Sequence, residues 1–121
     1  MIQGLRTVIY PVTNLPEATA WYEQAVGKAP YFNEAFYVGF EVGGFELGLI
    51  PDGQPGSSGA TAYWGTADAD AELARLVALG AEVDAPVSDV GGGIRVATVR
   101  DPDGNLFGVI QNPHFDRAKV E

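Results

Sequence analysis

The feature that most constrains the fold is one order of elements that occurs twice along the chain. In each half a strand-like run is followed by a helical segment and then by further strand-like runs. The segments R-T-V-I-Y-P-V-T-N-L and A-T-A-Y-W-G-T-A-D-A align at an offset of 54, and G-F-E-L-G-L-I and G-N-L-F-G-V-I align at an offset of 60. One such unit cannot cover its own sheet, so the two units should pack against each other.

Local signals set the elements of the first half. A strand over residues 6–13 should precede a helix that Asn14 caps and that Gly27 ends. The pair Gly43 and Gly44 predicts a tight hairpin turn between strand-like runs at 36–42 and 45–50. Residues 51–59 (P-D-G-Q-P-G-S-S-G) form the one clear linker.

The second half repeats these signals. A strand over 60–67 leads to a helix that Asp68 or Asp70 caps and that Gly80 ends, and D-P-D-G turns the chain into its last strand. Asp101 is expected to accept backbone N–H groups in that turn. The sequence therefore predicts a single domain over 1–121, with modules at about 1–50 and 60–112.

Composition narrows the classes of function. Apolar residues make up 46% of the 121, charged residues 19%, and the formal net charge is −9. That charge disfavours nucleic acid and anionic membrane surfaces as partners. The absence of cysteine excludes disulfides, thiolate metal sites and cysteine nucleophiles. With no signal peptide or membrane-spanning run in view, we expect a cytoplasmic protein.

The chain resembles the vicinal oxygen chelate superfamily, also called glyoxalase/bleomycin-resistance/dioxygenase proteins. The residues that carry the resemblance are V-T-N-L-P-E-A-T-A-W-Y-E-Q-A-V-G (12–27) and D-P-D-G-N-L-F-G-V-I (101–110). It implies an α/β (α+β) fold of two tandem βαβββ modules, with a curved mixed sheet around a central cavity and the helices outside. Small members of this family commonly pair, so we also expect a homodimer.

The resemblance further implies four positions that supply metal ligands in metal-using members. Here they hold Thr7, Gly48, Thr61 and Gly108. A neutral threonine hydroxyl is a weak ligand for transition metals, and glycine offers no side chain. We therefore predict no metal and no other cofactor.

Strand alternation from these four positions indicates which other side chains face the cavity. The predicted wall is mostly apolar and aromatic, with a few hydroxyls, one carboxylate and one guanidinium, which is typical of a small-molecule pocket. A cavity filled by its own side chains is the alternative. The predicted ligand-binding residues are Thr7, Ile9, Phe36, Val38, Phe40, Glu46, Gly48, Thr61, Tyr63, Thr98, Arg100 and Gly108.

Glu46 is the one candidate catalytic residue. Alternation places it on the face of Gly48, where a carboxylate in an apolar wall could accept and return a proton. An ion pair with Arg100, or exposure to water at the end of the strand, would instead make it structural.

These observations favour a metal-independent protein that binds a small apolar or aromatic molecule and sequesters a toxic or antibiotic compound, rather than an enzyme. A metal-free isomerase or lyase with Glu46 as general base is the alternative. A metal-dependent glyoxalase or dioxygenase would need ligands that the sequence does not supply. A structural or interaction domain with a closed cavity is the fourth hypothesis.

Overall fold

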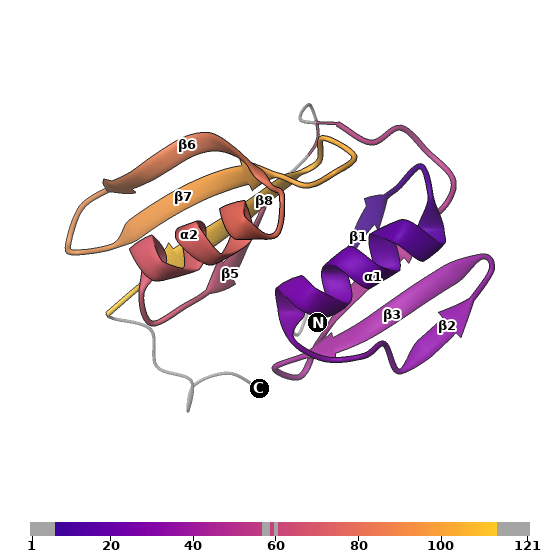
Figure 1. Cartoon of the computed structure of the whole chain (residues 1–121). Coiled ribbons are helices and arrows are strands. Elements are labelled where there is room, and N and C mark those ends of the chain that lie inside the picture. Colours follow the sequence, from indigo (N-terminus) through magenta and orange to yellow (C-terminus); the bar gives the residue numbers. More distant parts are fainter. Residues whose placement is uncertain (1–6, 57–58, 60, 114–121) are drawn as a thin grey trace.

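The computed structural model describes residues 7–56, 59 and 61–113, which form two modules of one helix and four strands each (Figure 1). The N-terminal module consists of β1 (Thr7–Pro11), α1 (Leu15–Val26), β2 (Phe32–Glu34), β3 (Tyr37–Val42) and β4 (Phe45–Ile50). The C-terminal module consists of β5 (Ala62–Gly65), α2 (Ala69–Ala78), β6 (Glu82–Asp89), β7 (Arg95–Arg100) and β8 (Leu106–Gln111).

Helix α1 begins and ends at the residues that the sequence predicts. The Asn14 side chain accepts a hydrogen bond from the Glu17 backbone N–H at 3.0 Å, which satisfies one free donor of the first turn. Pro16 lies in that turn, where its missing N–H costs nothing. Gly27 ends the helix with φ 81°, a conformation that glycine adopts without steric cost.

Helix α2 follows the same rules. Of the two acidic residues that could cap it, Asp68 does so, accepting from the Ala71 backbone N–H at 3.1 Å. Gly80 follows the helix with φ 98°. Within the part of the chain that the structure describes, neither helix is long and apolar enough to cross a membrane.

The two sheets have equivalent strand orders, β1-β4-β3-β2 and β5-β8-β7-β6. In each, the first strand runs parallel to the last strand of its module, and the remaining pairs are antiparallel. Ile9 pairs with Gly48, and Tyr63 pairs with Gly108, so the register is the same in both modules. The predicted fold class of two tandem βαβββ modules is confirmed.

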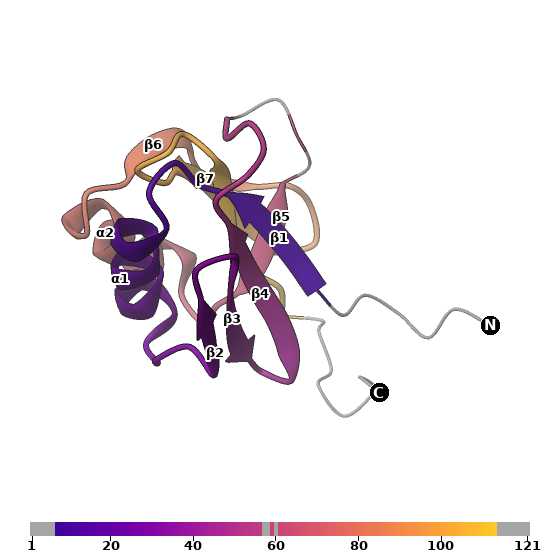
Figure 2. The same cartoon turned by 90° about the vertical axis from the view of Figure 1, so that its right-hand side faces the viewer.

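Both helices cover the same side of the molecule, and the other face of each sheet carries no helix (Figures 1 and 2). We call this second side the open face. The helix side holds one apolar core built from both modules. Trp21 of α1 contacts Phe107 of β8 edge-on, with ring centroids 6.2 Å apart, and Trp64 of β5 stacks on Phe107, with ring centroids 5.6 Å apart. The modules are therefore joined by a shared aromatic core.

The D-P-D-G-N turn of the C-terminal module also bonds to the N-terminal module. Asp101 accepts from the backbone N–H groups of Asp103 at 2.9 Å and Asn105 at 2.8 Å, as predicted for this turn. Its second oxygen accepts from the Tyr22 hydroxyl of α1 at 2.8 Å. The Asn105 side-chain amide donates to the Pro11 carbonyl at 2.7 Å. The turn thus fixes the β1–α1 end of one module against the other.

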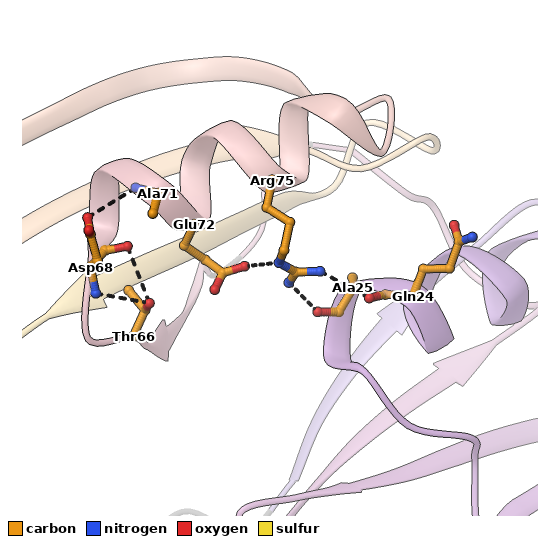
Figure 3. A network of polar contacts seen from close by, with 7 residues as sticks. All are labelled: Gln24, Ala25, Thr66, Asp68, Ala71, Glu72 and Arg75. Atoms are coloured by element: carbon orange, nitrogen blue, oxygen red, sulfur yellow. Dashed lines mark hydrogen bonds and ion pairs between the residues drawn. The ribbon is translucent and has the colours of Figure 1, made fainter.

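A third connection runs between the helices (Figure 3). Arg75 of α2 donates to two carbonyls at the C-terminal end of α1, those of Gln24 at 3.1 Å and Ala25 at 2.6 Å. Glu72, one turn earlier on α2, forms an ion pair with the same guanidinium. Helix α1 has no basic residue in its own last turn, so the other module supplies the cation that its C-terminus favours.

Candidate functional site

The open face of the N-terminal sheet gathers several of the predicted site residues. Thr7 pairs with Glu46 and Ile9 pairs with Gly48 on neighbouring strands, so these four share one face. Ile9 leaves 50% of its surface exposed, which is high for an isoleucine in a strand. The face is therefore accessible in a single chain.

Val38 and Phe40 do not lie on this face, so the prediction that they line the cavity wall is wrong. They pair with Leu49 and Leu47, and all four side chains are at most 1% exposed in the core beneath α1. The predicted register of β3 was off by one residue, which moves every side chain of a strand to the opposite face. The residues of β3 on the open face are Tyr37, Gly39 and Glu41.

Two neighbouring glycines create room for tyrosines on the open face. Gly39 and Gly48 pair directly across β3 and β4. The Tyr37 ring crosses Gly48, where an added Cβ would meet the Tyr37 Cζ at 2.7 Å. An added Cβ on Gly39 would meet Tyr31 Cε1 at 3.3 Å. The sheet surface is therefore covered by two aromatic rings instead of side chains of its own at these positions.

Both tyrosines donate to one carboxylate. The hydroxyls of Tyr31 and Tyr37 each hydrogen-bond one oxygen of Glu46, which is half-buried. Burial raises the pKa of Tyr37, so this hydroxyl keeps its proton and acts as a donor. Glu46 is thus not isolated in an apolar wall. The suggested ion pair with Arg100 does not form either, because Arg100 pairs with Asp84 at 2.7 Å.

Exposed aromatic side chains adjoin this polar group. Phe32 of β2 contacts Tyr37 with ring centroids 6.1 Å apart, and Phe36 contacts Phe32 edge-on at 6.0 Å. Tyr31 and Phe36 leave 63% and 67% of their surface exposed. We call Tyr31, Phe32, Phe36, Tyr37 and Glu46 the tyrosine–carboxylate cluster.

Sequence reasoning found only two members of this cluster, Phe36 and Glu46. It missed β2 entirely, because three residues are too few to show alternation. The signal that could have located the tyrosines is the run Y-F-N-E-A-F-Y (31–37), which holds four aromatic residues close to Glu46 in the hairpin.

The open face of the C-terminal sheet has a related arrangement. Tyr63 lies over its partner Gly108, where an added Cβ would meet Tyr63 Cδ1 at 2.6 Å. Thr98 pairs with Gly108, and its hydroxyl donates to Asp84 at 2.8 Å. Arg100 holds the other oxygen of Asp84. Tyr63, Thr98, Arg100 and Gly108 therefore share one face, while Thr61 lies just before β5.

The residues at the four metal positions of the family do not fit a metal ion. At Gly48 and Gly108 the space that a ligating side chain would need is taken by the rings of Tyr37 and Tyr63. Thr7 and Thr61 offer only hydroxyls. Among the described residues, no group of three or more His, Cys, Asp or Glu side chains could hold an ion.

A groove between the modules lies on the helix side instead of the open side. Its volume is about 200 Å³, and its walls include Val26, Val42, Trp64 and Phe107, with Arg75 beside them. Ligand pockets usually enclose roughly 300–1,000 Å³. The tyrosine–carboxylate cluster, with its convergent polar groups and exposed rings, is the better candidate site.

Comparisons with known proteins agree with this architecture. The profile of the Glyoxalase/Bleomycin resistance protein/Dioxygenase superfamily matches residues 4–109. The fold is similar to that of the fosfomycin resistance protein FosX from Listeria monocytogenes, with TM-score 0.79 and 20% identity over 94% of this chain and 97% of that one. It is also similar to a glyoxalase-related enzyme from Fulvimarina pelagi, with TM-score 0.77 and 19% identity over 93% and 90%.

A third similar structure is TioX from Micromonospora sp. ML1, with TM-score 0.68 and 21% identity over 89% of this chain and 98% of that one. The comparison with curated proteins gives no match. The family profile spans both modules and most of the chain. The chain therefore belongs to the Glyoxalase/Bleomycin resistance protein/Dioxygenase superfamily.

Proposed function

We propose that this protein binds a small organic molecule without a metal ion, at the tyrosine–carboxylate cluster on the open face of the N-terminal sheet. The observation that carries the proposal is the convergence of two phenols on Glu46 among aromatic rings that are largely exposed. Exposed aromatic groups around a few placed polar groups are typical of ligand sites. The rings of Tyr37 and Tyr63 fill the space over Gly48 and Gly108, two of the four metal positions of the family, which supports binding that needs no metal.

The biological role that we propose is sequestration of a toxic or antibiotic compound in the cytoplasm. The similarity of the fold to that of a fosfomycin resistance protein supports this role. A binding protein needs only a surface that is complementary to its ligand. The cluster provides such a surface, and binding requires no additional group that reacts with the ligand.

We further propose a homodimer. Ile9 and Tyr63 belong to edge strands of the two sheets and are 50% and 49% exposed on the open faces. Apolar side chains at a sheet edge favour cover by another copy of the chain. A partner laid over these faces would convert them into a closed site.

Proton-transfer catalysis is the second candidate function, and one observation favours it. The cluster contains a carboxylate and two phenolic hydroxyls in contact, which is a base with two proton donors. In an isomerase or lyase, Glu46 would take a proton from a carbon next to a carbonyl, while a tyrosine would donate a hydrogen bond to the developing oxyanion.

The test is a fluorescence titration with N-phenyl-1-naphthylamine, a neutral aromatic probe. Phe36→Ala should weaken binding because it removes an exposed ring of the cluster, whereas Val77→Ala should not, since Val77 lies on α2 and is 44% exposed. Glu46→Gln should change affinity only a few-fold in a binding protein. If wild type and Phe36→Ala bind the probe equally, the site is misplaced.

A further inference from the structure

The tyrosine–carboxylate cluster holds a negative charge that the described residues do not balance. Each basic side chain in the described ranges is in an ion pair with another acid: Lys28 with Glu41, Arg75 with Glu72, Arg95 with Asp70, and Arg100 with Asp84. Glu46 instead accepts hydrogen bonds from two neutral phenols. A half-buried carboxylate is stabilised by a nearby cation, and among the described residues no basic side chain forms an ion pair with Glu46.

The groups around Glu46 add to the negative potential. Aromatic rings carry partial negative charge on their faces and attract cations placed over them. The Phe32 ring is tilted against that of Tyr37, and the Phe36 ring meets Phe32 edge-on, so the faces of the three rings have different directions. Glu34 pairs with Tyr37 across β2 and β3 and brings a second, exposed carboxylate to the same face.

We propose that the ligand of this site is a small organic cation, a quaternary or protonated amine with apolar substituents. The proposal rests on the proposed function of the cluster and names its ligand class. The charged nitrogen lies against Glu46 and the tyrosine rings, and the apolar substituents contact Phe32 and Phe36. The net charge of −9 draws cations toward the protein from a distance.

The experiment compares choline with 3,3-dimethylbutan-1-ol, its uncharged isostere, by NMR titration of the full-length protein. The two probes have the same shape, so a difference in affinity reports the charge alone. We expect choline to bind about tenfold more tightly, and we expect its affinity to fall as the salt concentration rises.

Two variants and one control locate the effect. Glu46→Gln keeps the hydrogen-bonding shape and removes the charge, so it should abolish the preference for choline. Phe36→Leu keeps an apolar side chain and removes the ring, so it should reduce that preference. Asp70→Asn removes one charge at an exposed ion pair on α2 and should leave it unchanged.

The outcomes separate this inference from the proposed function. Equal affinity for choline and its isostere, with N-phenyl-1-naphthylamine still bound, overturns the proposal of a cationic ligand and leaves the proposed binding function standing. If none of the three probes binds, both proposals are overturned. If Glu46→Gln changes the dimerisation constant and not the affinity for choline, the occupant of the face is a second copy of the chain, and the cation proposal fails.

Discussion

Tyr37 lies across Gly48 so closely that a Cβ on the glycine would come within 2.7 Å of the Tyr37 Cζ. The absence of a side chain at Gly48 is therefore what lets the Tyr37 hydroxyl reach Glu46, its hydrogen-bond partner. In the other module the Tyr63 ring likewise lies across Gly108. Gly48 and Gly108, at two of the metal positions of the family, therefore leave the space that these aromatic rings occupy.

The first prediction concerns these glycines. Gly108→Ala should lower the free energy of unfolding by about 1–3 kcal/mol, a typical cost of overpacking. Its Cβ would meet both the Tyr63 ring at 2.6 Å and the Ala62 carbonyl oxygen at 2.9 Å, and backbone cannot move aside easily. Gly48→Ala should cost less, because only the far end of the Tyr37 side chain must swing away.

Gly65→Ala is the matched control for both changes. Gly65 lies in β5, and an added Cβ there has nothing within 4 Å. Urea denaturation of the three variants should rank Gly108→Ala as the least stable and Gly65→Ala as close to wild type. A Gly108→Ala protein as stable as Gly65→Ala would contradict the close packing.

The second prediction concerns the arginine between the helices. Arg75→Ala should destabilise the protein by about 1 kcal/mol, because it removes two hydrogen bonds and a cation at the C-terminus of α1. Arg95→Ala should cost less, about 0.5 kcal/mol or under, since its ion pair with Asp70 is exposed. Equal losses in thermal denaturation would show that Arg75 contributes only as a surface charge.

The sequence predicts which side chains of a strand share the open face only where a recognisable turn fixes the end of that strand. The D-P-D-G turn anchors β7, and Thr98 and Arg100 lie on the face that counting from that turn indicates. β3 has no such anchor. Apolar or aromatic side chains occur on both of its faces, at Tyr37 as well as at Val38 and Phe40, so alternation could not identify the inner one.

The partners of Glu46 were beyond sequence reasoning for a different reason. Tyr31 precedes the three-residue strand β2, and its backbone N–H bonds to the Gly39 carbonyl at 3.0 Å. This bond holds Tyr31 against β3, and the sequence around Tyr31 contains no pattern that predicts a strand there. The Asn14 cap and the glycine turn were predictable because each depends on neighbouring residues alone, and the module order was predictable because the same order of elements occurs twice.

The third prediction concerns metal. With threonine and glycine at the four family positions, the chelator-treated protein should bind no zinc, manganese or nickel at one-to-one stoichiometry in calorimetry. The release of a stoichiometric metal from the purified protein in elemental analysis would contradict this. So would tight binding that is lost when Thr7 or Thr61 is replaced by alanine.

The fourth prediction concerns assembly. Sedimentation equilibrium at micromolar concentration should return the mass of two chains. Ile9→Lys should shift the equilibrium toward one chain, because it places a charge on a half-exposed apolar position of the β1 edge. Val77→Lys on α2 is the control, with similar exposure on the helix side. A wild-type protein of single-chain mass would refute the dimer.

The last prediction follows from Asp101, which is 5% exposed and holds the turn that joins the modules. Burial raises the pKa of this carboxyl above its ordinary value of 3.8, against the opposing effect of hydrogen bonds from Tyr22, Asn105 and Asp103. The folded protein therefore binds this proton more tightly than the unfolded chain does. The resulting stability is fully present below pH 3.8 and is lost as the pH rises through the folded pKa.

Asp101→Asn keeps the shape of the side chain and removes its charge, so the variant lacks this dependence. The free energy of unfolding of wild type minus that of Asp101→Asn should fall as the pH rises above about 4, by at most about 1.4 kcal/mol per pH unit. Urea denaturation at several pH values from 4 to 8 measures this difference. Asp70→Asn, which removes an exposed carboxylate, corrects for the general loss of one negative charge. A difference that grows with pH would mean that the hydrogen bonds to Asp101 outweigh its burial and that the turn is held by the ionised form.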